Sequence, residues 1–457
     1  MHTPGSRSWR AGLVPTGRPG AHEVRPAALV VVAVAAGALG ALGGVALRAL
    51  VGLLTQVFTG SADPSLHSVG VDLSHPAVPW LGAGVLVAAP VLGGLLQGPV
   101  VHRWAPVSAR GLGVPEVMLA VARDGGRVPP RVAAVKAYAA SVCLGSGGSV
   151  GVVGPTVQIG AVLASGAGQL LRLPDHRLRA VVAAGAAAGI TGAFDAPLAG
   201  ALFAVELVLL EISGGALAVL ALAVATGVGV GHLLGTGGPL LALPPHTVAG
   251  GPALAAVGVL GVAAGATGAL FTRFLYATAD VCDRLWRGPE WLRPAVGGLL
   301  LGGLLLWWPQ LYGVGYGAVA DALAGRFVLV TLLALVALKI LATSLTLGVG
   351  GSGGVFAPAL FVGAMLGGAC GQVVTTVWPG SGTDAAAFTV IGMAAVLAGT
   401  VRAPATAVAF VVEVLAVPDL LAALLVAVLL AAVTSRLLCA DTVYTRKLTR
   451  RGVALHR

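Results

Sequence analysis

The stretch GGSVGVVGP at residues 147–155 has a second copy in this chain, GGSGGVFAP at residues 350–358. Both copies follow the pattern GGSxGVxxP, in which glycines surround a short run that ends in proline. A second pair of similar segments follows further along the chain. APLAGALFAVE (196–206) and APATAVAFVVE (403–413) share Ala-Pro and a glutamate at matching places. The chain therefore carries the same local design twice.

A third and weaker pair supports the repeat. GLG at 111–113 and GVG at 313–315 lie 202 residues apart, close to the 203 residues that separate the two GGSxGVxxP copies. Glycine is so frequent here that one match would mean little, but three matches keep the same order along the chain. The sequence therefore predicts two homologous repeats, residues 27–235 and residues 236–440.

The amino-acid composition is that of a membrane protein. Of the 457 residues, 57% are hydrophobic and only 10% are charged, with a mean hydropathy of +0.96, whereas soluble domains carry about 25% charged residues. Apolar stretches long enough to cross a bilayer as helices recur, for example at residues 27–47, 214–233 and 252–270. These stretches lack the alternation of a membrane-spanning β-strand. An all-α protein with many membrane crossings is predicted.

Basic residues are concentrated at the two ends of the chain. The formal net charge is +10, yet the loop at 59–79 contains two aspartates and no lysine or arginine. By the positive-inside rule, both ends are expected in the cytoplasm, with an even number of crossings. We expect a cytoplasmic segment at 1–26, a cytoplasmic tail at 441–457, a plasma-membrane location and no binding of nucleic acid. Only seventeen residues follow position 440, so no soluble domain is expected there.

Each repeat is predicted to contain broken helices. A glycine-rich break precedes one helix, and Ala-Pro opens another that carries a glutamate, Glu206 in the first repeat and Glu413 in the second. Non-helical backbone at membrane depth occurs where it is buried in protein or lines a cavity. Helix N-termini that meet in such a place form an anion site from exposed N–H groups and the positive end of the helix dipole. In transporters built from repeats, the site lies between the halves. The pattern predicts a pore or transporter for an anion.

Four motifs resemble those of the CLC family of voltage-gated chloride channels and chloride–proton antiporters, in the family's order. GLGVPE (111–116) resembles the family motif GSGIPE, and GSVGVVGPTVQIG (148–160) resembles GREGP. GGVFAP (353–358) resembles GIFAP, and FDAPLAGALFAVE (194–206) is similar to the segment that follows the second motif. The resemblance covers roughly residues 27–452 and is to the prokaryotic type, which lacks C-terminal CBS domains. It implies two inverted-topology repeats with broken, tilted helices, and a homodimer with one pore in each subunit.

The resemblance also implies two sites for chloride or another small anion, and no metal or cofactor. The central site would take the backbone amides of Val355 and Phe356 and the hydroxyl of Tyr444, with Leu112 at the position of the family's serine. The external site would be formed by the loop Gly151, Val152, Val153 and Gly154. Lys136 matches a family lysine. We weigh equally an electrostatic role for it in the pore and a role as a cytoplasmic anchor.

Three positions depart from the family. Val153 stands where the family has its gating glutamate, and Leu207 stands where antiporters have a proton-transfer glutamate. A carboxylate about 4 Å from an anion would repel it by about 4 kcal/mol at an effective dielectric near 20. Valine has no such charge and carries no proton, so passive chloride conduction is predicted. Leu112 lacks the serine hydroxyl, which predicts slow conduction or a preference for another anion such as nitrate, thiocyanate or fluoride.

Other readings stay open. The chain could be an antiporter that uses a different acid, Glu211 or Glu116, or a family member that no longer conducts. A membrane-embedded enzyme would need clustered His, Asp or Glu residues, and no HxxxH or HExxH occurs, so that reading is rejected. Glu116, Glu206 and Glu413 are expected to bond to nearby backbone amides or to each other. Lys339 is expected to extend toward the membrane surface.

Overall fold

The computed structural model describes residues 26–61, 75–77, 79–105, 110–209, 211–236, 238, 241, 251–379 and 384–453. The cytoplasmic segment expected at 1–26 therefore lies, except for its last residue, outside the described residues. The regular structure of the described residues is helical throughout, and the only β-type pairing among those residues is a single bridge. This confirms the all-α fold class.

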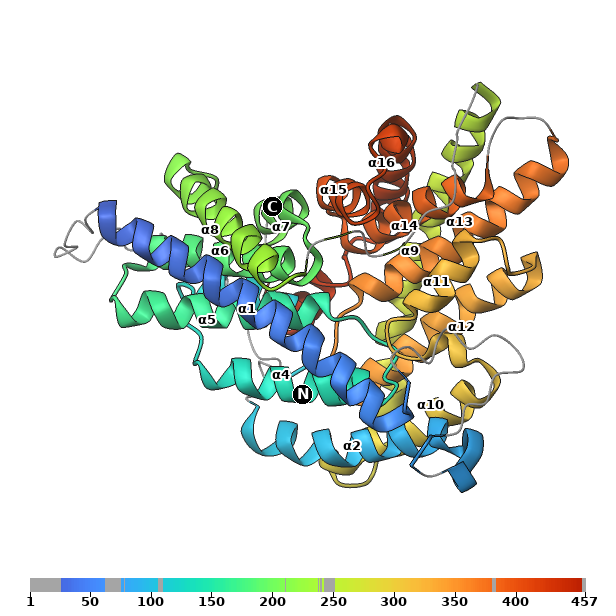
Figure 1. The fold of residues 1–457 in the computed structure, drawn as a ribbon, viewed down its shortest axis with the longest axis horizontal. Helices are drawn as coiled ribbons and strands as arrows, with labels where there is room; N and C mark the ends of the chain where they lie inside the picture. The colour runs from blue at the N-terminus through green and yellow to red at the C-terminus, as the bar shows by residue number, and fades with distance from the viewer. Residues whose placement is uncertain are drawn as a thin grey trace, which may run out of the picture.

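The helices fall into two series that follow one another along the chain (Figure 1). The first series is α1 (Pro26–Thr59), α2 (Val85–Trp104), α3 (Val114–Arg123), α4 (Arg131–Gly145), α5 (Val153–Leu170), α6 (Asp175–Phe194), α7 (Pro197–Phe203) and α8 (Gly214–Leu233). The second is α9 (Gly251–Leu285), α10 (Arg293–Trp307), α11 (Tyr316–Leu323), α12 (Leu329–Gly348), α13 (Phe356–Val377), α14 (Ala385–Val401), α15 (Pro404–Leu415) and α16 (Leu421–Leu438). The tail helix α17 (Thr445–Arg450) follows.

The two series repeat the same backbone geometry at matching places. Gly147 and Gly350 both have positive φ, 109° and 96°, and each lies in the break that precedes a central helix. Asp195 and Arg402 both adopt the left-handed conformation, with φ of 51° and 56°, although this conformation costs a non-glycine residue about 1 kcal/mol or more. The repeat read from the sequence therefore extends to single backbone conformations. The boundary between residues 235 and 236 stays a prediction.

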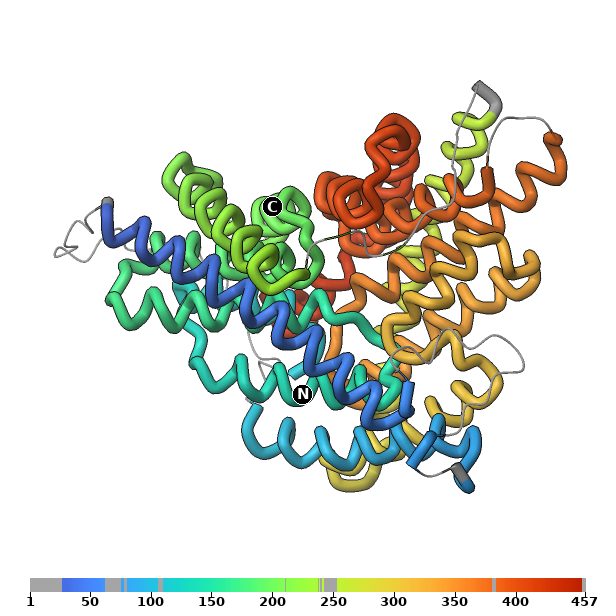
Figure 2. Tube along the Cα trace, in the orientation of Figure 1, coloured from blue at the N-terminus to red at the C-terminus, as the bar shows by residue number. Residues whose placement is uncertain are grey.

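The two halves lie side by side (Figure 2), and corresponding helices from them contact each other. Helix α2 packs on α10, and α7 packs on α15. Seven described helices are long and apolar enough to cross a membrane, and three apolar helices are shorter. The even number of crossings and the cytoplasmic position of both ends stay predictions.

Two glutamates join the halves by capping helices across the interface. Glu206, in the π-helical turn Ala204–Val208 after α7, accepts hydrogen bonds from the amides of Ala405 (3.1 Å) and Thr406 (2.7 Å) at the start of α15. Glu413 of α15 accepts bonds of 2.7 Å from two amides at the start of α7. Each carboxylate thus satisfies N–H groups that have no partner within their own helix. The expectation that both glutamates bond to backbone amides is confirmed, and the amides belong to the opposite half.

We expect Glu206→Ala and Glu413→Ala to lower the thermal stability of the detergent-solubilised protein. Each substitution leaves two backbone N–H groups at a half-buried helix start without their acceptor, and an unsatisfied buried donor costs about 1–3 kcal/mol. Glu211→Ala is the matched control because that side chain is exposed, and exposed substitutions usually change stability by less than about 0.5 kcal/mol. The midpoint of thermal unfolding should fall for the first two variants only. An equal midpoint for Glu206→Ala and Glu211→Ala would contradict the capping role.

Candidate functional site

The two copies of the GGSxGVxxP pattern meet at the centre of the protein. Gly151 and Gly354 form a two-way backbone pair, with N–H···O distances of 2.8 Å and 2.7 Å. Helix α5 begins two residues after the first glycine, and α13 begins two residues after the second. The pair therefore brings together the N-termini of two helices from opposite halves. Their first amides have no partner within the helix, and both dipoles present their positive ends.

A third backbone break packs directly on this junction. A Cβ atom placed on Gly154 would lie 2.3 Å from the carbonyl oxygen of Leu112, and one on Gly113 would lie 2.5 Å from the carbonyl oxygen of Gly154. Glycine at both positions is therefore required for the loop 111–113 to touch the start of α5. The structure thus brings together three of the four motifs that the sequence singled out, those at 111–116, 148–160 and 353–358.

The predicted site residues at the two helix starts are all buried. Val152 and Val355 are the N-cap residues of α5 and α13, and Val153 and Phe356 are the first residues within those helices. Their side chains are at most 4% exposed. Phe356 packs edge-on against Phe410, with ring centroids 4.8 Å apart. The junction is therefore lined by apolar side chains, and the polar groups that it offers an anion belong to the backbone.

Tyr444 is held rigidly in the core while its hydroxyl group stays without a partner. Its ring is fully buried, and among the described residues no group hydrogen-bonds to the hydroxyl oxygen. The preceding residue is fixed on both sides, because the Val443 carbonyl accepts a 2.7 Å bond from Tyr276 and its amide donates to Thr400. Burial raises the pKa of Tyr444, so the hydroxyl stays protonated and can donate. An unmet buried donor is costly, and an anion would satisfy it.

Two buried lysines hold the glycine loops of the two halves in the same way. Lys136 of α4 is 4% exposed and donates to the carbonyl of Gly111. Lys339 of α12 is fully buried and donates to the carbonyls of Gly313 (2.9 Å) and Leu311 (3.3 Å). The prediction that Lys339 extends to the membrane surface is wrong, because its ammonium is used inside the protein. The two lysines lie 203 residues apart, the spacing of the repeated motif, and this signal could have revealed their shared role.

The acids considered for a proton route, and Leu207 where antiporters have a glutamate, lie in different surroundings. Leu207 is 5% exposed and packed in the core, whereas Glu211 is exposed. Glu116 is buried, accepts a 2.8 Å bond from the amide of Gly113, and pairs with Lys447 of the tail helix. Of the two acids considered for a proton route, only Glu116 therefore lies beside the loop 111–113.

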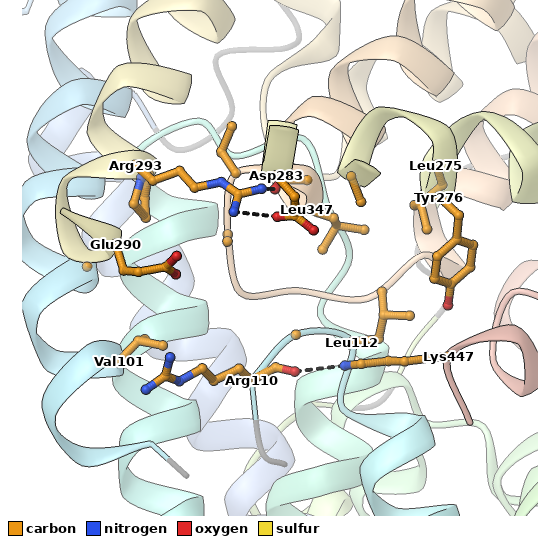
Figure 3. Close-up of a pocket in the computed structure, with 18 of the residues that line it drawn as sticks. Val101, Arg110, Leu112, Leu275, Tyr276, Asp283, Glu290, Arg293, Leu347 and Lys447 are labelled. Atoms are coloured by element: carbon orange, nitrogen blue, oxygen red, sulfur yellow. Dashed lines mark hydrogen bonds and ion pairs between the residues drawn. The ribbon is translucent and has the colours of Figure 1, made fainter. Parts of the chain in front are cut away.

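A cavity of about 420 Å³ leads to this loop (Figure 3). We call it the vestibule. It is formed by the end of α2, the loop 110–112, the second half of α9, the start of α10, the end of α12 with the three residues after it (347–351), and α17 with Arg451. Its size is in the range of small-molecule sites. Leu112 stands at its wall beside Tyr276 and Lys447. The charged lining residues are four basic ones and two acidic ones, Arg110, Arg293, Lys447, Arg451, Asp283 and Glu290.

Two of the basic side chains of the vestibule, Arg293 and Arg110, are fixed by bonds to surrounding groups. Arg293 pairs with Asp283 at 2.6 Å and also donates to the carbonyl of Gly348. Arg110 donates to the carbonyls of Ala105 and His102, at 3.3 Å and 3.0 Å. This cavity could not be predicted from the sequence, because its wall combines residues from both repeats and the tail. The excess of positive charge favours anions over cations at the approach to Leu112.

This combination of repeated halves, facing helix N-termini and a basic approach is that of an anion-transporting membrane protein. A family model described as "Voltage gated chloride channel" matches residues 93–436. A "Putative chloride channel protein ClcB-like" of Ralstonia nicotianae is 34% identical over 390 residues, 83% of this chain and 89% of the relative. An "H(+)/Cl(-) exchange transporter ClcA" of Vibrio vulnificus is 30% identical over 386 residues, 80% of this chain and 81% of the relative.

Solved structures agree with these sequence relatives. The crystal structure of a slow cyanobacterial Cl−/H+ antiporter superimposes with a TM-score of 0.81 at 25% identity, covering 93% of this chain and 98% of the other. A CLC-type fluoride/proton antiporter shares the fold, with a TM-score of 0.72 at 23% identity over 92% of this chain and 96% of the other. The chain belongs to the CLC family of voltage-gated chloride channels and chloride–proton exchangers.

Proposed function

We propose that this protein is a passive chloride channel of the CLC family. The observation that carries the proposal is Val153, a buried valine at the first position of α5, next to the junction of the two helix N-termini. A gate that competes with the anion needs a carboxylate at this place, and a proton carrier needs a titratable group. Valine supplies neither, so this position can neither block the chloride path nor couple chloride movement to proton movement.

The anion is held by the protein's own dipoles at two places. The amides of Val152 and Val153 bind it at the outer site, and those of Val355 and Phe356, with the Tyr444 hydroxyl, bind it at the central site. The unpartnered hydroxyl of Tyr444 supports this assignment. Chloride arrives through the basic vestibule and passes Leu112, whose buried side chain makes this entrance narrow and slows conduction. Lys136 acts by fixing the carbonyl of Gly111 next to this entrance.

Loss of proton coupling is also supported by the surroundings of Leu207. Leu207 cannot carry a proton, and its neighbour Glu206 is bonded to the amides of α15. We further propose a homodimer in the plasma membrane, with the vestibule and the tail on the cytoplasmic side, and a transport role without enzymatic activity or cofactor. The concentration of arginine and lysine around the vestibule agrees with this orientation.

Proton-coupled exchange is the second candidate, because relatives of this chain bear the names of exchangers and antiporters. Its proton would have to use an acid other than the missing two. Glu116 lies beside the central loop and is the first candidate for such a shuttle, whereas the exposed Glu211 lies after the π-helical turn.

We expect purified protein in proteoliposomes to release chloride when a potassium ionophore is added, without accompanying proton uptake. The measurement records external chloride and external pH together. A chloride gradient should drive no proton movement, because neither Val153 nor Leu207 titrates. Proton movement in a fixed ratio to chloride would favour exchange, and the next variant would be Glu116→Gln. Absence of flux with chloride, nitrate, thiocyanate and fluoride would favour a family member that no longer conducts.

A further inference from the structure

A buried ion pair joins the tail helix α17 to the loop 110–113, which we call the entrance loop because it carries Leu112. Lys447 of α17 contacts Glu116 of α3, and their side chains are 17% and 5% exposed. The same ammonium donates to the carbonyl of Arg110 at 2.7 Å, while the second carboxylate oxygen accepts from the amide of Gly113 at 2.8 Å. The pair therefore bonds to the backbone on both sides of Leu112, at Arg110 and at Gly113.

The ammonium lies directly against this loop. A Cβ atom placed on Gly111 would come within 2.6 Å of the Lys447 nitrogen, and Lys447 lines the vestibule together with Leu112 (Figure 3). Opposite charges in such close contact largely cancel at a distance. Removal of either one leaves a full charge beside the entrance, where low exposure weakens solvent screening.

We propose that Lys447 and Glu116 form a balanced charge pair that sets the electrostatic potential at Leu112, and through it the occupancy of the vestibule's inner end by chloride. The inference rests on the proposed function, since it assumes that chloride enters through the vestibule. It assigns to two residues outside the anion-contacting set a role in anion affinity. The pair acts through the field, and neither residue has to touch the ion.

The contacts of α17 allow this electrostatic role to be separated from a structural one. Arg450 binds Asp280 of α9 through two bonds of 2.8 Å and 2.6 Å, and the Tyr276 hydroxyl holds the carbonyl of Val443. The tail helix thus stays attached to the second half when Lys447 is replaced. The entrance loop keeps its bond from Lys136 to the Gly111 carbonyl.

The test uses variants of nearly unchanged shape. Glu116→Gln keeps an oxygen that can accept from Gly113, and Lys447→Met keeps most of the stem. Burial lowers the pKa of Lys447, and Glu116 counteracts this shift. Both variants are therefore compared with wild type at about pH 6, well below the ordinary lysine pKa of about 10.4. Chloride affinity is measured by calorimetry and by initial efflux rates at constant ionic strength.

We expect chloride affinity to rise about tenfold in Glu116→Gln and to fall about tenfold in Lys447→Met. The double variant should return to within about threefold of wild type, because it is neutral again, and Lys447→Arg should resemble wild type. Asp280→Asn is the control, because it removes the charge that pairs with Arg450 of α17 in a half-exposed ion pair. Solvent screening there should keep the change in chloride affinity below about twofold.

Opposite shifts in the two single variants are the decisive result, since a purely structural bond would make both variants worse. Shifts in the same direction, or none, would overturn the inference while wild-type chloride flux still upheld the proposed function. A wild-type protein that neither binds nor conducts chloride would overturn both. If a single variant does not fold, the other single variant and Lys447→Arg still decide the sign of the effect.

Discussion

Replacement of Val153 by glutamate is expected to lower chloride flux at neutral pH by at least about tenfold. The position is the first residue of α5 and is 1% exposed, so a carboxylate there would stand at the amides that we propose as the outer anion site. At about 4 Å and an effective dielectric near 20, the repulsion is about 4 kcal/mol, and every 1.4 kcal/mol is about tenfold in occupancy. The measurement is chloride efflux from proteoliposomes at neutral pH.

The same variant should regain flux when the external pH falls. A carboxyl group loses its charge below its pKa, ordinarily about 4.3 for glutamate, and a neutral group no longer repels chloride. Wild type should change little over this range, because valine does not titrate. Val153→Gln is the matched control, with the size of glutamate but no charge, and it should show no recovery on acidification. Equal flux in Val153→Glu and wild type at neutral pH would show that the anion does not pass this residue.

Much of the fold could be predicted because the same motifs occur in both repeats. The GGSxGVxxP copies predicted two breaks before two helices, and the structure joins them through the Gly151–Gly354 pair. The Ala-Pro segments predicted the starts of α7 and α15, because proline fits the first turn of a helix, where its missing N–H costs nothing. Repetition removed the ambiguity that hydropathy alone leaves in a chain so rich in glycine and alanine.

The parts that the sequence did not predict depend on contacts between segments with no shared pattern. Lys447 and Glu116 are 331 positions apart, and neither belongs to a repeated motif that would link them. The expectation for Lys339 was wrong because a lysine in an apolar helix commonly reaches the membrane surface, and hydropathy carries no information about partners inside the fold. In the fold, α12 places it against the loop at 311–313, whose carbonyls offer partners inside the protein. Buried cations are satisfied by tertiary structure, which periodicity does not report.

Replacement of Leu112 by serine is expected to increase chloride affinity by about tenfold and to raise the transport rate. A hydrogen bond from a hydroxyl to a charged group contributes about 1.5–3 kcal/mol, which corresponds to about tenfold or more in affinity. The leucine is 4% exposed at the wall of the vestibule, so its removal also widens the approach to the central junction. The measurements are chloride titration by calorimetry and initial efflux rates in proteoliposomes.

Leu112→Ala separates the two effects of this substitution. It removes the same bulk without supplying a donor, so we expect it to raise the rate while leaving chloride affinity within about twofold of wild type. Both variants should lose similar thermal stability, because a buried leucine side chain contributes about 2–5 kcal/mol, and the comparison between them therefore isolates the hydroxyl. Tyr444→Phe removes the other donor and should weaken chloride binding in the Leu112→Ser background as well as in wild type. Equal affinity in Leu112→Ser and Leu112→Ala would mean that the entrance loop does not face the bound anion, and the backbone amides with Tyr444 would then hold it alone.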